Sequence, residues 1–251
     1  MNQKKNLLEL IIDGDLKSVK LEIENGADPN FTNKNWSPLL VASQKGNLEI
    51  VKFLLSKNAD INHQNNGVTA LYIACQEGHT DIVRELIANK ADVNLNSGVS
   101  PLLIASQEGH LEIVRLLLDA NANINIVDSG ASALHFATSN NQIEIVKELS
   151  EKKANPDIQD RGDTPLILAV DNDFEEIAKI LIKAGASFTL KNHGILCKRD
   201  YATDPELIQL MESNPKTRKK TKNSKKSDTN KKTRLKKGKG LFRACTSSKQ
   251  N

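Results

Sequence analysis

The stretch VSPLLIA at residues 99–105 occurs five times in this chain of 251 residues, with small changes each time. The copies are WSPLLVA at 36–42, VTALYIA at 68–74, VSPLLIA at 99–105, ASALHFA at 131–137 and DTPLILA at 163–169. Each is followed, after a short polar turn, by a second apolar run such as EIVKFLL at 49–55. Self-similarity at a fixed period of 31 or 32 residues predicts a stack of short supersecondary units, that is, a solenoid.

The chemistry of each unit predicts two helices. A Ser or Thr before the first helix is expected to cap it by accepting a hydrogen bond from a free backbone N–H. Gly46, Gly78 and Gly109, replaced later by Asn141 and Asp173, are expected to end that helix in a left-handed conformation. An acid opens the second helix, where it complements the helix dipole. The expected caps are Ser37, Thr69, Ser100, Ser132 and Thr164, and Pro follows the cap at 38, 101 and 165.

This pattern resembles the ankyrin repeat family. The Ser/Thr-Pro-Leu phrases match the family signature, Gly-His recurs at 78–79 and 109–110, and the G-A-D-x-N ending occurs as GADPN at 26–30 and in variants elsewhere. The resemblance covers about residues 5–212. It implies an all-α solenoid of antiparallel helix pairs joined by β-hairpin loops, here called fingers. It also implies that partners bind the concave face formed by the fingers and the first helices.

The domain organisation follows from where the phrase begins and stops. We expect an ankyrin repeat domain over 1–212, with an N-terminal cap at about 4–33, five central repeats at about 34–193 and a C-terminal cap at about 194–212. Residues 213–251 are rich in Lys, Arg, Ser, Thr and Asn, which predicts a disordered basic tail.

Charge is divided between these two parts. Residues 213–251 hold 15 of the 35 Lys and Arg and one of the 31 acids, so the tail carries +14 and residues 1–212 carry −10. Two basic clusters in the tail resemble a bipartite nuclear localisation signal, which implies an importin-type receptor and an intracellular protein of the cytoplasm, the nucleus or both. The alternatives are a solvated basic arm, contact with nucleic acid, or contact with anionic membrane. The clusters consist of Lys219, Lys220, Lys231, Lys232, Arg234, Lys236 and Lys237.

The sequence predicts a protein that is not an enzyme. It lacks a zinc-protease helix motif, a Gly-rich phosphate loop and a nucleophile elbow, so no catalytic, cofactor or metal site is expected. His79, His110 and His135 occupy repeat positions, to which the resemblance gives a structural hydrogen-bonding role. The three cysteines are widely spaced and Cys75 is expected to be a small packed side chain. No apolar run is long enough to predict a membrane span.

Binding residues are expected where the copies differ, because the shared positions build the stack. Trp36 is the first candidate, since Trp is enriched in binding hot spots; the alternative is packing against the N-terminal cap through Phe31. Tyr72 replaces the signature His, and either faces a partner or packs within its repeat. The full set is Trp36, Gln44, Lys45, Tyr72, Gln76, Glu77, Gln107, Glu108 and Asp163, with finger residues that include Asp128, Asp160 and Arg161.

These observations favour a monomeric adaptor or regulatory scaffold that binds another protein, whose binding segment we expect to be basic. Two alternatives remain open: a nucleic-acid-associated factor that uses the tail, and an effector of an intracellular microbe that acts on host proteins.

Two positions suggest that the fifth unit is the weakest. Lys153 stands where Gly26 and Gly185 stand in other units, and Ser150 stands where the others have Leu or Ile. Lys90, in an earlier unit, occupies the same position as Lys153. If the first position is left-handed, each Lys costs about 1 kcal/mol of stability.

Overall fold

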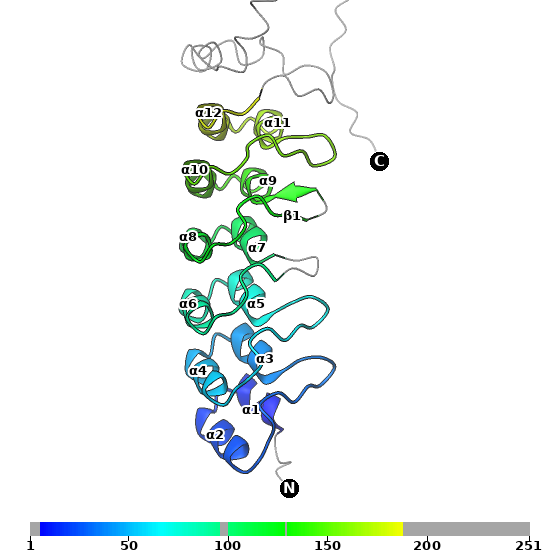
Figure 1. Cartoon of the computed structure of the whole chain (residues 1–251), viewed down its shortest axis with the longest axis vertical. Coiled ribbons are helices and arrows are strands. Elements are labelled where there is room, and N and C mark those ends of the chain that lie inside the picture. Colours follow the sequence, from blue (N-terminus) through cyan, green and yellow to red (C-terminus); the bar gives the residue numbers. More distant parts are fainter. Residues whose placement is uncertain (1–5, 96–99, 129, 188–251) are drawn as a thin grey trace, which may run out of the picture.

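The computed structural model describes residues 6–95, 100–128 and 130–187, which form twelve helices in six consecutive pairs. The pairs stack in chain order into one elongated column, with the first helix of every pair on one side and the second on the other (Figure 1). The first helices are α1 (Leu7–Ile12), α3 (Pro38–Gln44), α5 (Ala70–Gln76), α7 (Pro101–Glu108), α9 (Ala133–Ser139) and α11 (Pro165–Asp171). The second helices are α2 (Leu16–Glu24), α4 (Leu48–Ser56), α6 (Thr80–Ala88), α8 (Leu111–Asp119), α10 (Ile143–Glu151) and α12 (Glu175–Lys183). The predicted α-solenoid is therefore confirmed.

The first helices begin at the predicted caps, but the caps do not all work in the same way. Ser37, Thr69 and Thr164 each accept a hydrogen bond from the backbone N–H three residues later. The prediction is wrong for Ser100, whose side chain accepts no capping hydrogen bond. The Ser132 hydroxyl instead lies 2.8 Å from Nδ1 of His135, because in this unit a histidine ring reaches back to the cap.

The turn that ends each first helix is left-handed, as predicted, with φ of 75° at Gly78 and 57° at Asp173. At Gly78 a second constraint acts, because an added Cβ would lie 2.7 Å from the ring of His110 in the next unit. The Gly-His pairs thus link neighbouring units: the ring of each turn histidine covers the glycine of the unit before it.

The turn that follows each second helix is left-handed too. The backbone φ is 96° at Gly26, 66° at Lys90 and 64° at Lys153, and Asn58 and Asn121 take similar values. Lys90 and Lys153 therefore adopt the left-handed conformation that the aligned copies predict. Glycine adopts it without the steric cost that a Cβ adds.

The core runs without a break along the stack. Leu and Ala of the first helices pack against Ile, Val and Leu of the second, and the most fully buried side chains include Leu39, Leu71, Leu102, Leu134 and Ile113. Cys75 lies fully buried within it, in the small-residue position of α5, as expected. Burial raises the pKa of its thiol, so the side chain stays neutral at physiological pH.

The fingers at 33–36, 65–68 and 160–163 are short two-residue turns. Strand β1 (Val127–Asp128) pairs antiparallel with β2 (Ala131–Ser132), and single bridges join Asn33 to Trp36, Asn65 to Val68 and Asp160 to Asp163. Positive φ at both central residues, as at Arg161 and Gly162, matches the right-handed twist of a hairpin. In Figure 1 the fingers of the described residues project past the first helices, on the side away from the second helices.

A ladder of side-chain hydrogen bonds joins successive units below the fingers. The Asn30 side chain accepts from the backbone N–H of Asp60 at 2.7 Å, and Asn125 accepts from Asn155 at 2.8 Å. Equivalent bonds run from Asp92 to Asn62, from Asn123 to Asn94 and from Ser187 to Asp157. The recurring Asn of the G-A-D-x-N ending thus satisfies a backbone donor of the next unit.

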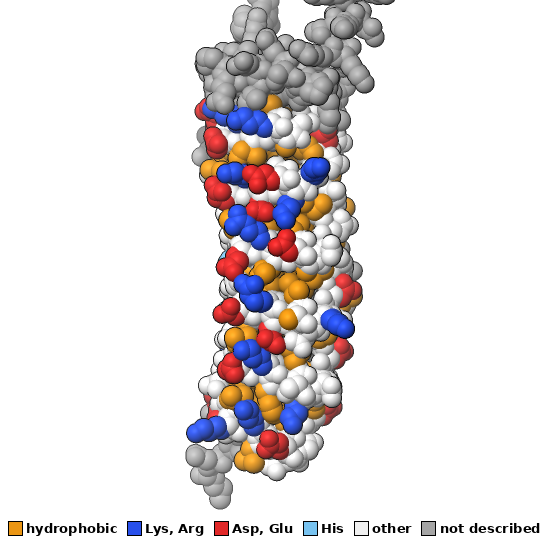
Figure 2. Space-filling model, turned by 60° about the vertical axis from the view of Figure 1, so that its left-hand side comes forward, with side chains coloured by type: hydrophobic (Ala, Val, Ile, Leu, Met, Phe, Trp, Pro, Cys, Tyr) orange, Lys and Arg blue, Asp and Glu red, His pale blue; other side chains and the backbone are white. Residues whose placement is uncertain are grey.

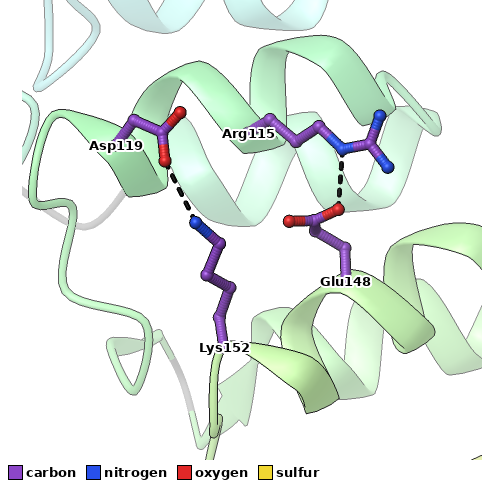
Figure 3. A network of polar contacts seen from close by, with 4 residues as sticks. All are labelled: Arg115, Asp119, Glu148 and Lys152. Atoms are coloured by element: carbon purple, nitrogen blue, oxygen red, sulfur yellow. Dashed lines mark hydrogen bonds and ion pairs between the residues drawn. The ribbon is translucent and has the colours of Figure 1, made fainter.

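Ion pairs connect neighbouring second helices on the opposite face. Figure 2 shows rows of acidic and basic side chains along this face. Arg84 of α6 lies 2.9 Å from Glu112 of α8. In Figure 3, Arg115 of α8 points toward Glu148 of α10, and Asp119 of α8 points toward Lys152, which follows α10. The Arg115–Glu148 pair is 2.6 Å apart and the Asp119–Lys152 pair is 3.1 Å apart. The bond to Glu148 raises the pKa of Arg115. The pairs of Arg84 with Glu112 and of Asp119 with Lys152 are exposed and add little stability, whereas the Glu148 side chain is only 12% exposed. All three pairs join one unit to the next.

One outer position is under-packed. Ser150 of α10 replaces the Leu or Ile of other units, and its hydroxyl is buried with no hydrogen-bond partner. A depression of about 440 Å³ lies beside it, between α10 and α12. The suspected weakness of this unit thus has a structural basis in both Ser150 and Lys153.

Candidate functional site

The predicted binding residues lie along the side of the stack that carries the fingers. Here we call this side the finger face; it consists of the finger turns and the exposed positions of the first helices. Exposed residues of the set are Gln44, Lys45, Gln76, Glu77 and Glu108. Half-buried ones are Trp36, Tyr72, Gln107 and Asp163. The localisation residues of the tail lie outside the described residues.

Trp36 is partly exposed at the base of the first central finger. Its backbone exchanges two hydrogen bonds with Asn33, and its side chain packs partly against the core. Phe31, the packing partner considered from the sequence, is 45% exposed. The indole thus has a structural contact and an accessible part, so its role in binding stays a prediction.

A small depression lies where three consecutive units meet on the finger face, and here we call it the socket. Its volume is about 70 Å³. Tyr72 comes from α5, Gln107 from α7, Asp128 from β1 and Phe136 from α9. The stacking of the units therefore brings together side chains that are up to 64 residues apart in sequence. Its remaining lining residues are Ser100, Leu103 and Ile104.

The socket has a negative electrostatic environment. The pKa of Tyr72 is raised, first because the phenol is partly buried and second because the carboxylates of Glu108 and Asp128 oppose a further negative charge nearby. A field that disfavours an anion favours a cation at the same place. The socket is therefore suited chemically to a positively charged group held between aromatic rings and a carboxylate.

Sequence comparison found part of this site. Tyr72, Gln107 and Glu108 were predicted, and Asp128 was among the finger residues. Phe136 was missed as a site residue because it follows the signature position and looks like a core residue. The signal was present, since the equivalent positions hold Val41, Ile73, Ile104 and Leu168 and only this unit has an aromatic.

His135 precedes the socket residue Phe136 on α9 and has a structural role. Its Nδ1 accepts from the backbone N–H of Ser132 at 3.1 Å, and its Nε2 lies 3.1 Å from the Asp163 carbonyl of the next finger. Both contacts are satisfied by the neutral ring that carries its proton on Nε2. Burial lowers the pKa of His135, which keeps the ring in this form.

The two turn histidines, His79 and His110, also bridge units. Nε2 of His79 lies 3.4 Å from the carbonyl of Gln44, and Nε2 of His110 lies 3.3 Å from that of Gln76. Within the described ranges, no three His, Cys, Asp or Glu side chains are grouped as a metal site would require. In that same part of the chain, no helix is both long and apolar enough to cross a membrane.

Charge changes sign along the finger face. Lys34 and Lys45 lie in the first central unit. From the second central unit onward, acids predominate in the fingers and at the ends of the first helices, with Arg161 as a basic exception. These acids are Glu77, Glu108, Asp128, Asp160, Asp163 and Asp171.

The comparisons identify the family to which this architecture belongs. A family model described as "Ankyrin repeats (3 copies)" matches residues 7–97, 61–128 and 102–192, so the chain belongs to the ankyrin repeat family. Ankyrin repeats generally mediate protein–protein interaction and are typically non-catalytic binding modules, so protein partners are implied.

Solved structures agree with this assignment. The chain is similar to the ankyrin repeat domain of human ASB11, with 28% identity and a TM-score of 0.69 over 76% of this chain and 88% of that one. It is also similar to an ankyrin repeat domain from Acinetobacter baumannii, with 29% identity and a TM-score of 0.67 over 72% of this chain and 98% of that one. A comparison with curated proteins found no match.

Proposed function

We propose that this chain is an adaptor or regulatory scaffold that binds another protein through its finger face, while its basic tail governs location. The observation that carries the proposal is the pattern of variation on this face. Positions that build the stack repeat from unit to unit, whereas three positions on this face change along it. They are the position of Trp36 and Asp163, the position of Tyr72, and the position that Glu77 and Glu108 share. A partly exposed Trp, a half-buried Tyr and a run of acids supply anchors and charge for recognition.

Affinity capture with the full chain tests this proposal. We expect Trp36→Ala to weaken capture of the bound partner by more than about tenfold, because truncating a hot-spot Trp commonly has that effect. Far-ultraviolet circular dichroism and a thermal melt on the same variant check the fold. Loss of the folded state would assign Trp36 to structure, and unchanged capture by a folded variant would remove it from the binding surface.

A substitution on the opposite face supplies the matched control. Phe53 is also a half-buried aromatic that packs partly against the core, but it lies on the second helix α4. Phe53→Ala should leave capture nearly unchanged at equal protein concentration. Equal losses from Phe53→Ala and Trp36→Ala would mean that the effect comes from stability rather than from contact.

The charge of the tail favours a second candidate, a nucleic-acid-associated factor. Residues 213–251 carry +14, and a segment of this kind binds phosphate backbones with an affinity that falls steeply with salt. Replacing Lys231, Lys232, Arg234, Lys236 and Lys237 with Gln separates the two uses. A loss of salt-sensitive DNA binding supports the second candidate, whereas a loss of nuclear accumulation without DNA binding supports import.

A further inference from the structure

We infer that the socket between Tyr72, Gln107, Asp128 and Phe136 takes the Arg or Lys side chain of an extended basic segment of a partner protein. The inference rests on the proposed function, since it names the chemistry of the partner that the finger face would bind. It assigns a position on the stack and a type of side chain to that partner.

The size of the socket suits one cationic end group. Its volume is about 70 Å³, under half of the roughly 150 Å³ of an apolar cavity that holds a benzene ring. A guanidinium or ammonium group therefore matches this space better than an aromatic ring or a whole peptide does. The stem of the side chain would lie along the apolar wall formed by Leu103 and Ile104.

The groups around the socket recognise positive charge in two ways. Tyr72 and Phe136 are aromatic, and the face of an aromatic ring attracts a cation electrostatically. Asp128 lines the same space, and the carboxylate of Glu108 is close enough to act on the Tyr72 phenol. Gln107 adds an amide oxygen that accepts hydrogen bonds.

The combination occurs at one level of the stack. Where Tyr72 stands, the other central units have Leu40, Leu103, His135 and Ile167. Phe136 is likewise the one aromatic at its position among the five copies. The stacking of the units brings these two exceptions to the same socket, so it is not a by-product of the repeat itself.

The surroundings extend the charge complementarity beyond one residue. Glu77 and Glu108 lie at the ends of α5 and α7, and Asp160, Asp163 and Asp171 continue the acidic character in the later units. A segment that runs along the finger face would therefore meet acids at successive units. An extended chain rises by about 3.3 Å per residue, so one basic residue every few positions would keep the segment in register.

The test uses the full chain and a defined probe. The probe is an acetylated (Gly-Arg)₄ amide, and its control is the same peptide with citrulline in place of Arg, which keeps the shape and removes the charge. Isothermal titration at low salt should show binding of the Arg peptide at least about tenfold tighter than that of the citrulline peptide, as expected when charge-assisted contacts are lost. Equal binding of the two peptides would overturn the inference.

Matched variants separate the socket from the general charge of the protein. Asp128→Asn and Glu144→Gln change the net charge equally, but Glu144 lies on the second helix α10. We expect Asp128→Asn to weaken the Arg peptide about fivefold more than Glu144→Gln does, because a local carboxylate contributes beyond a screened distant one. Phe136→Ile and Tyr72→Leu use residues that other units already hold, and each should weaken binding about threefold. Equal effects of Asp128→Asn and Glu144→Gln would refute a specific socket.

A spectroscopic readout reports on the socket directly. The chain has two tyrosines, so Tyr201→Phe leaves Tyr72 as the one phenol that titrates in the ultraviolet. The Arg peptide stays charged at pH 10–11, and a bound cation should lower the pKa of Tyr72. No shift at a saturating peptide concentration would place the cation elsewhere.

Three further outcomes reassign the result. If the Arg peptide binds after Lys231, Lys232, Arg234, Lys236 and Lys237 are changed to Gln but not before, the chain's own tail fills the socket and the partner assignment is overturned. If capture of a partner depends on Trp36 but not on Asp128, the socket fails while the proposed function stands. If neither substitution affects capture, the proposed function fails as well.

Discussion

Replacing Lys153 with Gly should stabilise the protein, although it removes a whole side chain. Lys153 follows α10 with φ at 64°, a left-handed conformation that costs a residue with a Cβ about 1–2 kcal/mol. Its side chain is exposed. Glycine removes the strain but makes the unfolded chain more flexible, which returns about 0.5–1 kcal/mol. The net gain is therefore about 0.5–1 kcal/mol.

Differential scanning calorimetry of the full chain measures this gain. For a domain of this size, 1 kcal/mol shifts Tm by about 2–4 °C, so we expect a rise of about 1–4 °C. Lys90→Gly, at φ of 66° in a distant unit, should give a similar rise, and the two effects should add.

Two control substitutions should lower Tm instead of raising it. Gly26→Lys places the same strain in the first unit, where an added Cβ would meet no atom within 4 Å, so it should lower Tm through backbone strain alone. Ala120→Gly changes the residue that follows α8, in the unit before that of Lys153. Its φ is −84°, so the substitution relieves no strain and should also lower Tm. An unchanged or lower Tm for Lys153→Gly, or a rise for Ala120→Gly, would refute the argument.

Three other substitutions test the packing at Ser150, the hydrogen bond of Asn125 and the burial of His135. Ser150→Leu should raise the free energy of unfolding by about 1 kcal/mol, because it fills the depression beside α12 and removes an unpaired hydroxyl; no gain in urea unfolding would mean that the depression cannot accept a branched chain. Asn125→Ala should lower it by about 1 kcal/mol by leaving the N–H of Asn155 without its side-chain acceptor, and hydrogen exchange at that amide should quicken. His135→Leu tests pH dependence: burial lowers the pKa of His135 below its ordinary 6.5, so the stability from the neutral ring is complete above that pH and falls as the pH drops below it. Wild type should thus lose more stability than His135→Leu between pH 7.5 and 5.5, and equal losses would show that the ring does not contribute.

Much of the fold could be predicted because each unit is built from local signals. Ser or Thr caps, Pro at the first helical position and glycine at the turn act within a few residues, so the sequence alone places both helices of a unit. The left-handed turns at Lys90 and Lys153 could be inferred as well, since aligned copies show Gly and Asn there. Ser100 departs from this pattern, because a hydroxyl in the right position does not ensure that a capping hydrogen bond forms.

The candidate site was harder to predict, because its parts come from different units. Tyr72 differs from its equivalents and could be selected for that reason, and Gln107 could be selected because its position changes to Ser139 and Asp171 in the later units. Phe136 follows the core pattern of its own helix, and nothing local shows that it lines the same socket as Tyr72, which lies two units earlier. The ladder of Asn30 and Asn125 was likewise invisible, since each bond joins residues about 30 apart.

The sequence by itself determined the repeat, its period, the helix pairs and the division of charge between residues 1–212 and the tail. These depend on short-range preferences and on composition, which need no knowledge of neighbours in space. The tertiary structure alone decided which exceptions to the repeat meet. Stacking sets Tyr72, Gln107, Asp128 and Phe136 around one small space and gives it a negative field, because side chains in adjacent layers lie within contact distance whatever their separation along the chain.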